Sequence, residues 1–171
     1  MRLFERPSQR ADLDTIDRQI IVLLQEDGRR THADMARIIG TSVQTVRNRI
    51  DRMTEAGVFT VRAILNPPGL GFDRDAIICL RVRQGCLKPV ADKLSALENV
   101  SYVGFISGSF DIMIEVYVRD DEHLFHFLTE ELAAIHEIEG SETWTVLRTQ
   151  KYNYGWANPL DDELVEPPAK E

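Results

Sequence analysis

Residues 31–57, THADMARIIGTSVQTVRNRIDRMTEAG, decide the fold of the N-terminal part of the chain. Apolar residues ahead of Gly40 recur at helical spacing, and Gly40 permits a left-handed turn, so a short helix is predicted to end there. Thr41 and Ser42 are both candidate N-caps for a longer helix that stops at Gly57. A short helix, a tight glycine turn and a longer helix follow one another as in a helix-turn-helix.

Another helix is predicted upstream of this stretch. Its apolar residues recur at three- and four-residue spacing and share one face: Ile16, Ile20, Leu23 and Leu24. Asp14 is a candidate N-cap for this helix. Asp17 lies three residues later, in the first turn, where the helix dipole favours a carboxylate.

The longer helix carries polar side chains opposite its apolar stripe and beside it. The residues that we predict to contact DNA, with the cap of that helix included, are Ser42, Gln44, Thr45, Arg47, Asn48, Arg49 and Arg52. The guanidinium group of arginine can form paired hydrogen bonds with a guanine edge, side-chain amides can do so with adenine, and cationic side chains bind phosphate. The alternative interpretation is a solvated, arginine-rich helix surface that binds nothing.

Charge is distributed unevenly along a chain whose net charge is −8. Residues 1–62 contain 11 arginines and 9 carboxylates, which gives +2, and the remainder contains 9 basic and 19 acidic residues, which gives −10. The acidic remainder would repel phosphate, so any contact with double-stranded DNA is expected from residues 1–62.

Residues 58–65 are rich in β-branched side chains and predict a strand, which would be a wing of the helix-turn-helix or a hinge. The Asn-Pro-Pro-Gly sequence of residues 66–69 breaks it. We therefore expect a DNA-binding domain over residues 1–62 and a strand or hinge linker over residues 63–74.

From residue 75 onward, short strands alternate with helices. Strands are predicted over 76–83, 100–106, 110–118 and 141–149, with helices over 88–97 and after Asp120 or Asp121. The order βαββαβ is that of a ferredoxin-like domain, here residues 75–151. The predicted class is thus α+β, a winged helix-turn-helix followed by this domain, and residues 152–171 form an aromatic and then acidic tail.

Two helices can cover only one face of a four-stranded sheet. The other face is expected to present apolar side chains: Ile77, Cys79, Val103, Phe105, Met113 and Tyr117. That is too much apolar surface to leave in water. We expect a second copy to cover it, because a two-fold dimer also suits a palindromic DNA site. The alternative is that the N-terminal domain covers it.

Composition indicates a cytoplasmic protein without a membrane span. Two cysteines make neither a disulfide framework nor a structural zinc site, which fits a reducing compartment. The apolar runs are far shorter than about 18 residues, the length that a spanning helix needs. Residues 1–12 lack the apolar region of a signal peptide.

No motif predicts catalysis, a metal site or a cofactor. A Gly-rich phosphate loop, a nucleophile elbow and a Cys-His pairing are all missing from the sequence. His123 and His126 could reach one metal together with Glu130. We interpret them instead as polar positions on the wet face of an amphipathic helix.

In order and spacing, these motifs resemble the Lrp/AsnC (leucine-responsive, feast/famine) family of transcription regulators. The matching segments are Leu13-Asp14-x-x-Asp17, Leu23-x-x-x-Asp27-x-Arg29, Ala36-x-x-x-Gly40-x-Ser42-x-x-Thr45-Val46-x-x-Arg49-Ile50, Gly57-Val58, Gly104-x-x-x-Gly108-Ser109-Phe110-Asp111-Ile112, and Thr143 with Lys151 eight residues later. The resemblance covers about Leu13 to Lys151. Thr41, where an aliphatic residue is usual, and the acidic tail depart from it.

The resemblance implies dimers that often assemble further, to tetramers or octameric discs, and an amino-acid or related effector bound between sensing domains. The candidate effector residues are Gly108, Ser109, Phe110, Asp111 and Thr143. A glycine turn exposes amides that could hold a carboxylate, Asp111 could take an α-ammonium, and Thr143 could add a hydroxyl. Glycine, serine and aspartate are also ordinary hairpin-turn residues, so a plain turn is the alternative.

Two other functions remain open at this stage. Siroheme decarboxylases share the two-domain layout, but their last segment contains a histidine, which the segment Lys151-Tyr152-Asn153-Tyr154-Gly155 lacks. An architectural DNA binder without an effector is the second. Our prediction is a sequence-specific transcription regulator that is not an enzyme.

Overall fold

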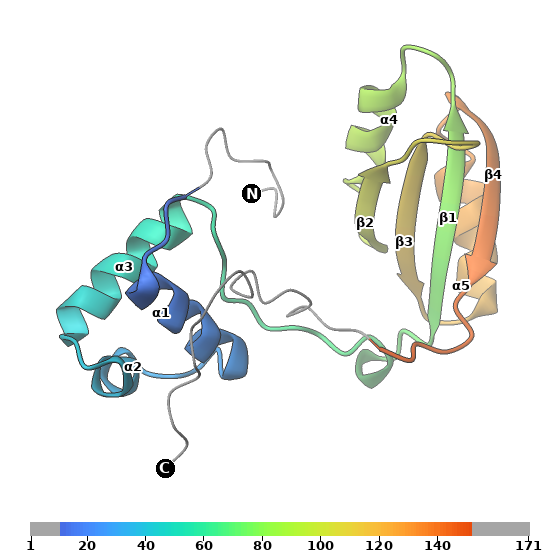
Figure 1. The fold of residues 1–171 in the computed structure, drawn as a ribbon. Helices are drawn as coiled ribbons and strands as arrows, with labels where there is room; N and C mark the ends of the chain where they lie inside the picture. Colours follow the sequence, from blue (N-terminus) through green and yellow to red (C-terminus); the bar gives the residue numbers. More distant parts are fainter. Residues whose placement is uncertain (1–10, 152–171) are drawn as a thin grey trace. The chain divides into compact units, whose positions relative to one another are not determined.

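The computed structural model describes residues 11–151, and its internal contacts divide them into two compact units (Figure 1). The division falls between Ile64 and Leu65, inside the linker expected over residues 63–74. Each unit has its own buried core. The tail predicted over residues 152–171 lies outside the described residues.

The first unit consists of helices α1 (Thr15–Glu26), α2 (His32–Ile39) and α3 (Val43–Glu55). Asp14 caps α1 as predicted, and the capping is reciprocal with Asp17. Of the two candidates for the cap of α3, Ser42 is the one used, since its hydroxyl accepts the N–H of Thr45 at 3.0 Å.

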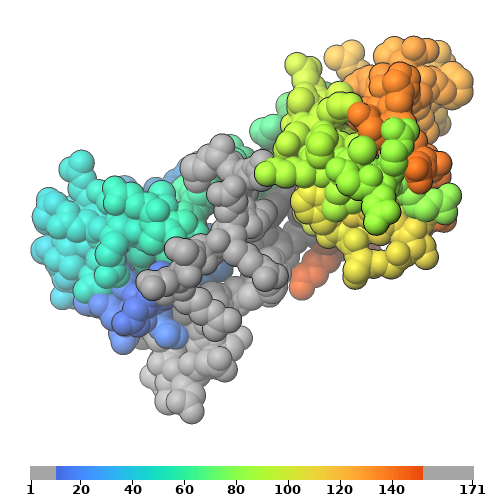
Figure 2. Space-filling model, turned by 90° about the horizontal axis from the view of Figure 1, so that it is seen from above, coloured from blue at the N-terminus to red at the C-terminus, as the bar shows by residue number. Residues whose placement is uncertain are grey.

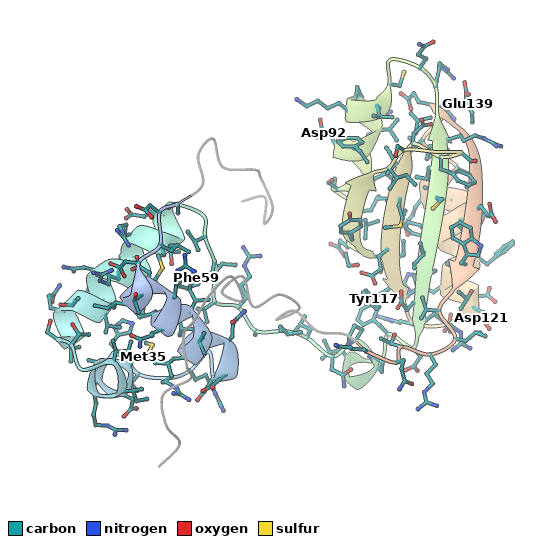
Figure 3. The ribbon with its side chains drawn as sticks, in the orientation of Figure 1. Met35, Phe59, Asp92, Tyr117, Asp121 and Glu139 are labelled. Atoms are coloured by element: carbon teal, nitrogen blue, oxygen red, sulfur yellow. The ribbon has the colours of Figure 1, made fainter. Side chains whose placement is uncertain are left out.

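The turn between α2 and α3 depends on Gly40, whose φ is 78°. A left-handed backbone suits glycine because it has no Cβ to meet the following carbonyl. The turn brings both helices onto α1 around an apolar core. Figure 3 shows Met35 on α2 within this core and Phe59, beyond α3, packed against it. The fully buried members are Ile20, Met35, Val46 and Met53.

The strand predicted over residues 58–65 is wrong in this structure. Val58 and Phe59 pack on the helical core, but the segment forms no ladder with any strand of the described chain. Ile64 and Leu65 are 65% and 69% exposed. A high content of β-branched residues favours extended backbone, but a strand also needs a partner with matching hydrogen bonds. The helix-turn-helix of the described chain therefore has no strand wing.

The second unit is the predicted βαββαβ domain. Its elements are β1 (Arg74–Val82), α4 (Leu87–Leu94), β2 (Val100–Phe105), β3 (Ile112–Val118), α5 (Asp121–His126) with a π-helical continuation (Phe127–Leu132), and β4 (Ile138–Thr145), preceded by a 3₁₀ turn (Pro68–Leu70). Asp120 caps α5. The sheet is antiparallel with order β2-β3-β1-β4, which confirms the α+β class.

Helices α4 and α5 cover one face of the sheet and form a single apolar core with it. Ile78 on β1, Ile114 on β3, Val90 on α4 and Phe127 beyond α5 are all fully buried. Figure 2 shows the green to orange residues of this unit packed as one body. Among the described residues, no helix is long and apolar enough to cross a membrane.

The register of the strands corrects the predicted composition of the other face of the sheet, here the open face. Val103 and Phe105 pair with Ile114 and Ile112, so they belong to the helix-covered side. Their neighbours on β2 take the open side instead, with Tyr102 paired to Glu115. A register irregularity between Val100 and Tyr102 accompanies this shift, and a one-residue shift moves every side chain to the opposite face.

Candidate DNA-contact surface and effector turn

The exposed face of α3 presents a row of polar side chains. Gln44, Arg47, Asn48 and Asp51 are all exposed, and their spacing of three and four residues gives them one side of the helix. Gln44 Nε2 donates to Asn48 Oδ1 at 2.7 Å. Arg47 Nε lies 4.0 Å from Asp51 Oδ2. This face offers an amide pair, one guanidinium and one carboxylate, all groups that recognise base edges.

Ser42 and Thr45 lie at the N-terminal end of the same helix. Their hydroxyl oxygens are 2.8 Å apart, and the Ser42 hydroxyl also caps the helix. In helix-turn-helix proteins, the N-terminal end of the recognition helix is the end whose residues contact base edges. In this structure, however, the hydrogen bonds of Ser42 and Thr45 are local and stabilise the first turn of α3.

Arg49 and Arg52 differ from Arg47, because carboxylates at the start of α1 bind them. Arg49 Nη1 lies 2.6 Å from Asp14 Oδ2 and 2.9 Å from Asp17 Oδ1. Arg52 Nη2 hydrogen-bonds to Asp17 Oδ2. The side chain of Asp17 is only 1% exposed. The structure therefore brings five of the seven predicted DNA-contact residues to the outer face or first turn of α3 and places two against α1.

These contacts shift the pKa values of Asp14 and Arg49. The pKa of Asp14 is lowered, first by the hydrogen bond from the Asp17 backbone N–H and then by the Arg49 side chain. The pKa of Arg49 is raised by its hydrogen bonds to Asp14 and then to Asp17. Asp51 was not among the predicted residues, although its (i, i+4) spacing from Arg47 was visible in the sequence.

The candidate effector turn joins β2 to β3 and is tied to β1. Gly108 has a φ of 133°, which favours glycine. The backbone N–H of Asp111 donates to Leu80 O at 2.9 Å, and Asp111 Oδ2 accepts the backbone N–H of Val82 at 2.8 Å. One carboxylate oxygen of Asp111 is thus already engaged within the fold.

Phe110 extends from this turn toward the open face of the sheet. Its ring meets Trp144 edge-on, with centroids 6.5 Å apart and an interplanar angle of 82°. The guanidinium carbon of Arg81 lies 5.7 Å from the centre of the same ring. An aromatic pair with a cation above it therefore borders the turn.

Thr143 is not brought to the turn within one chain. It pairs with Ile78, whereas the carboxylate of Asp111 accepts from the backbone of Val82, four residues farther along β1. Four residues of strand separate these positions by about 13 Å. A site that used both Asp111 and Thr143 would need these residues from different copies of the chain.

The open face also holds a pair of carboxylates. Asp75 on β1 pairs with Tyr117, and Glu115 pairs with Ile77, so both carboxylates point to the same side. Figure 3 shows Tyr117 near the end of β3. Oδ1 of Asp75 is buried without a hydrogen-bond partner. Burial, together with the charge of Glu115, raises the pKa of Asp75 to about 6.

The fold and these surfaces define a class: a DNA-binding regulator with a helix-turn-helix and a separate ligand-binding domain. Residues 13–54 match the AsnC-type helix-turn-helix domain, and residues 75–156 match the Lrp/AsnC ligand binding domain. The chain belongs to the Lrp/AsnC family of transcription regulators. It is therefore a regulator and not an enzyme, and the siroheme-decarboxylase alternative is set aside.

Relatives match over most of the chain. An uncharacterised HTH-type transcriptional regulator of Pyrococcus furiosus is 35% identical over 143 residues, which are 83% of this chain and 97% of the relative. The regulatory protein AsnC of Escherichia coli is 31% identical over 138 residues, which are 80% of this chain and 91% of that protein.

Solved structures agree with the family assignment. The structure of E. coli AsnC superposes with a TM-score of 0.78 at 28% identity and covers 83% of this chain and 97% of that one. A Neisseria meningitidis transcriptional regulator in complex with L-Met gives a TM-score of 0.77 at 22% identity, with 84% and 95% covered, which shows a common fold.

Proposed function

We propose that this regulator reads a specific DNA sequence through the outer face of α3, assembles through its open sheet face and responds to an amino-acid effector. The observation that carries the DNA part is the row Gln44, Arg47 and Asn48, exposed on one side of a capped helix. Amides read adenine and a guanidinium reads guanine in the major groove. Ser42 and Thr45, at the entering end of the helix, add donors for phosphate or bases.

Assembly is supported by the composition of the open face. Trp144 and Tyr102 are 46% and 45% exposed there, beside half-buried Ile77 and Met113. Apolar surface of this extent favours a partner, and a second copy supplies the same surface through a two-fold axis. Two helix-turn-helix units would then meet two half-sites of one operator. Further pairing of dimers to tetramers or octamers is part of the proposal.

The effector proposal rests on the turn at Gly108, Ser109, Phe110 and Asp111, with Thr143 supplied by another copy. The amides of the turn suit a carboxylate and the remaining oxygen of Asp111 suits an ammonium, which are the two charged groups of a free amino acid. The structural neighbour solved with L-Met binds a ligand of this class. An effector that bridges copies would couple its own binding to assembly and to DNA affinity.

The DNA proposal is tested with Arg47→Ala on a duplex selected by the wild-type protein from random DNA. Losing a base-reading arginine costs about 1–3 kcal/mol, so affinity for the selected duplex is expected to fall about 5- to 150-fold. Arg119→Ala, which removes an exposed arginine of the sheet unit, is the matched control and should bind like wild type. Equal binding by wild type and Arg47→Ala would overturn the assignment.

The effector proposal is tested by a thermal-shift screen of the twenty amino acids. A ligand that binds only the folded protein raises its melting temperature in proportion to the logarithm of its concentration. An architectural DNA binder would show no shift with any of them, and that result would favour the effector-independent alternative.

A further inference from the structure

The carboxylate of Asp17 is buried between α1 and α3. Its side chain is 1% exposed, while those of Arg49 and Arg52 are 24% and 57% exposed. Oδ1 accepts from Arg49, and Oδ2 accepts from Arg52 and, at 3.2 Å, from the backbone N–H of Asp14. Both oxygens thus have hydrogen-bond partners, without which burying a polar group costs free energy.

These hydrogen bonds determine how α3 is rotated about its own axis. Among the described residues, every side-chain hydrogen bond between α3 and the α1 segment ends on Asp14 or Asp17. The apolar contacts of Val46 and Met53 hold the helices together but are not directional. Charge-assisted hydrogen bonds from Arg49 and Arg52, three residues apart on one side of α3, are directional and fix which side faces outward.

The same contacts decide which positive charges DNA meets. Helix α3 contains three arginines, and carboxylates at the start of α1 bind two of them. The third, Arg47, stays on the outer face, where the carboxylate of Asp51 of the same helix lies 4.0 Å from it. Free arginines attract phosphate regardless of base sequence. Neutralising two of them lowers the sequence-independent part of the affinity and leaves the base-reading row in place.

We propose that Asp17 is a positioning and specificity-determining residue for DNA recognition: it fixes the rotation of α3 and keeps Arg49 and Arg52 away from the phosphate backbone. The proposal rests on the proposed function, since it presumes that the outer face of α3 reads DNA. It also assigns Arg49 and Arg52 a role different from the direct DNA contact that the sequence predicts.

The test is Asp17→Asn in the full chain, measured on the selected duplex and on a scrambled duplex across a range of salt concentrations. Freed arginines should strengthen binding to scrambled DNA, and each new phosphate contact should steepen the slope of log K against log [salt] by about 0.9. Affinity for the selected duplex should not rise as much, so the ratio of the two affinities should fall at least tenfold. Asp27→Asn makes the same charge change at an exposed position of the same unit and should leave this ratio unchanged.

A merely structural role would lower both affinities together and leave the salt slope unchanged, and that result overturns the proposal. If Asp17→Asn does not fold, Arg52→Gln decides, because its amide can still donate to Asp17. The proposal expects the salt slope of the wild type for Arg52→Gln, and a slope reduced by about 0.9 overturns it. If Arg47→Ala loses affinity for the selected duplex while Asp17→Asn keeps the wild-type ratio of the affinities for selected and scrambled DNA, this inference alone is rejected. Normal binding by Arg47→Ala would reject the proposed function.

Discussion

The backbone N–H of Val82 donates a 2.8 Å hydrogen bond to Oδ2 of Asp111. This bond fastens the turn between β2 and β3 to the end of β1, and the backbone N–H of Asp111 adds a second tie to Leu80. Asp111 therefore contributes to the fold and leaves its other oxygen as the candidate ligand group. A substitution that removes the whole carboxylate would confuse these two roles.

Asp111→Asn separates them, because its amide oxygen can still accept from Val82 while the negative charge is lost. We expect the variant to keep a melting temperature close to that of wild type and to bind the effector at least tenfold more weakly, since a charged hydrogen bond contributes about 1.5–3 kcal/mol. Isothermal titration calorimetry with an amino acid identified in the thermal screen measures this. Equal affinity for the amino acid in both proteins would show that the charge of Asp111 has no role in binding and that this segment is an ordinary hairpin turn.

Asp75 should make the stability of the sheet unit depend on pH. Its folded-state pKa of about 6 lies above the ordinary aspartate value of 3.8, because of burial first and then the charge of Glu115. The folded state therefore binds the proton more tightly than the unfolded state. The contribution of Asp75 to stability is fully present below about pH 3.8 and is lost as the pH rises through about 6.

Asp75→Asn removes this dependence. At pH 8 we expect the variant to be more stable than wild type in urea denaturation, and the difference should shrink as the pH falls below 6. Glu98→Gln, which also removes a carboxylate of this unit but at an exposed position, serves as the control. A pH-independent difference between wild type and Asp75→Asn would contradict the prediction.

Met113→Asp places a charge on the open face of the sheet, opposite Cys79. If a second copy covers this face, each dimer would bury two unpaired carboxylates, which costs several kcal/mol. Light scattering should then show a smaller assembly than wild type at the same micromolar concentration. Gln84→Asp adds the same charge in an exposed turn and should assemble normally. A wild-type monomer at that concentration would rule out the assembly part of the proposal.

Gly40→Ala tests the turn that positions α3. A Cβ at this position has no heavy atom within 4 Å, so the effect comes from the backbone alone. With φ at 78°, an L-residue is expected to destabilise the helical unit by about 1–2 kcal/mol. Gly28→Ala, at a glycine without positive φ, is the matched control. Denaturant unfolding that gives the same loss for both variants would refute this explanation.

The sequence alone determined the order of the elements and most of their positions. Helical periodicity, the cap at Asp14 and the glycine at residue 40 depend on residues within a few positions of one another, so they can be read locally. The alternation of Ile112, Ile114 and Val116 likewise marked β3 and its buried face. Family membership followed from the order and spacing of such local motifs.

Only the tertiary structure decided which residues from distant parts of the chain meet. Arg49 and Arg52 are residues of the type that contacts DNA. The carboxylates that bind them lie more than thirty residues upstream in the sequence. Residues 58–65 have the composition of a strand but no partner in the described chain. Val103 lies on the helix-covered face of the sheet and not, as predicted, on the open face, because of a register irregularity at the start of β2. Ion pairs, strand partners and strand register depend on how distant parts of the chain pack together. They cannot be predicted from the residue types and spacing of a short segment.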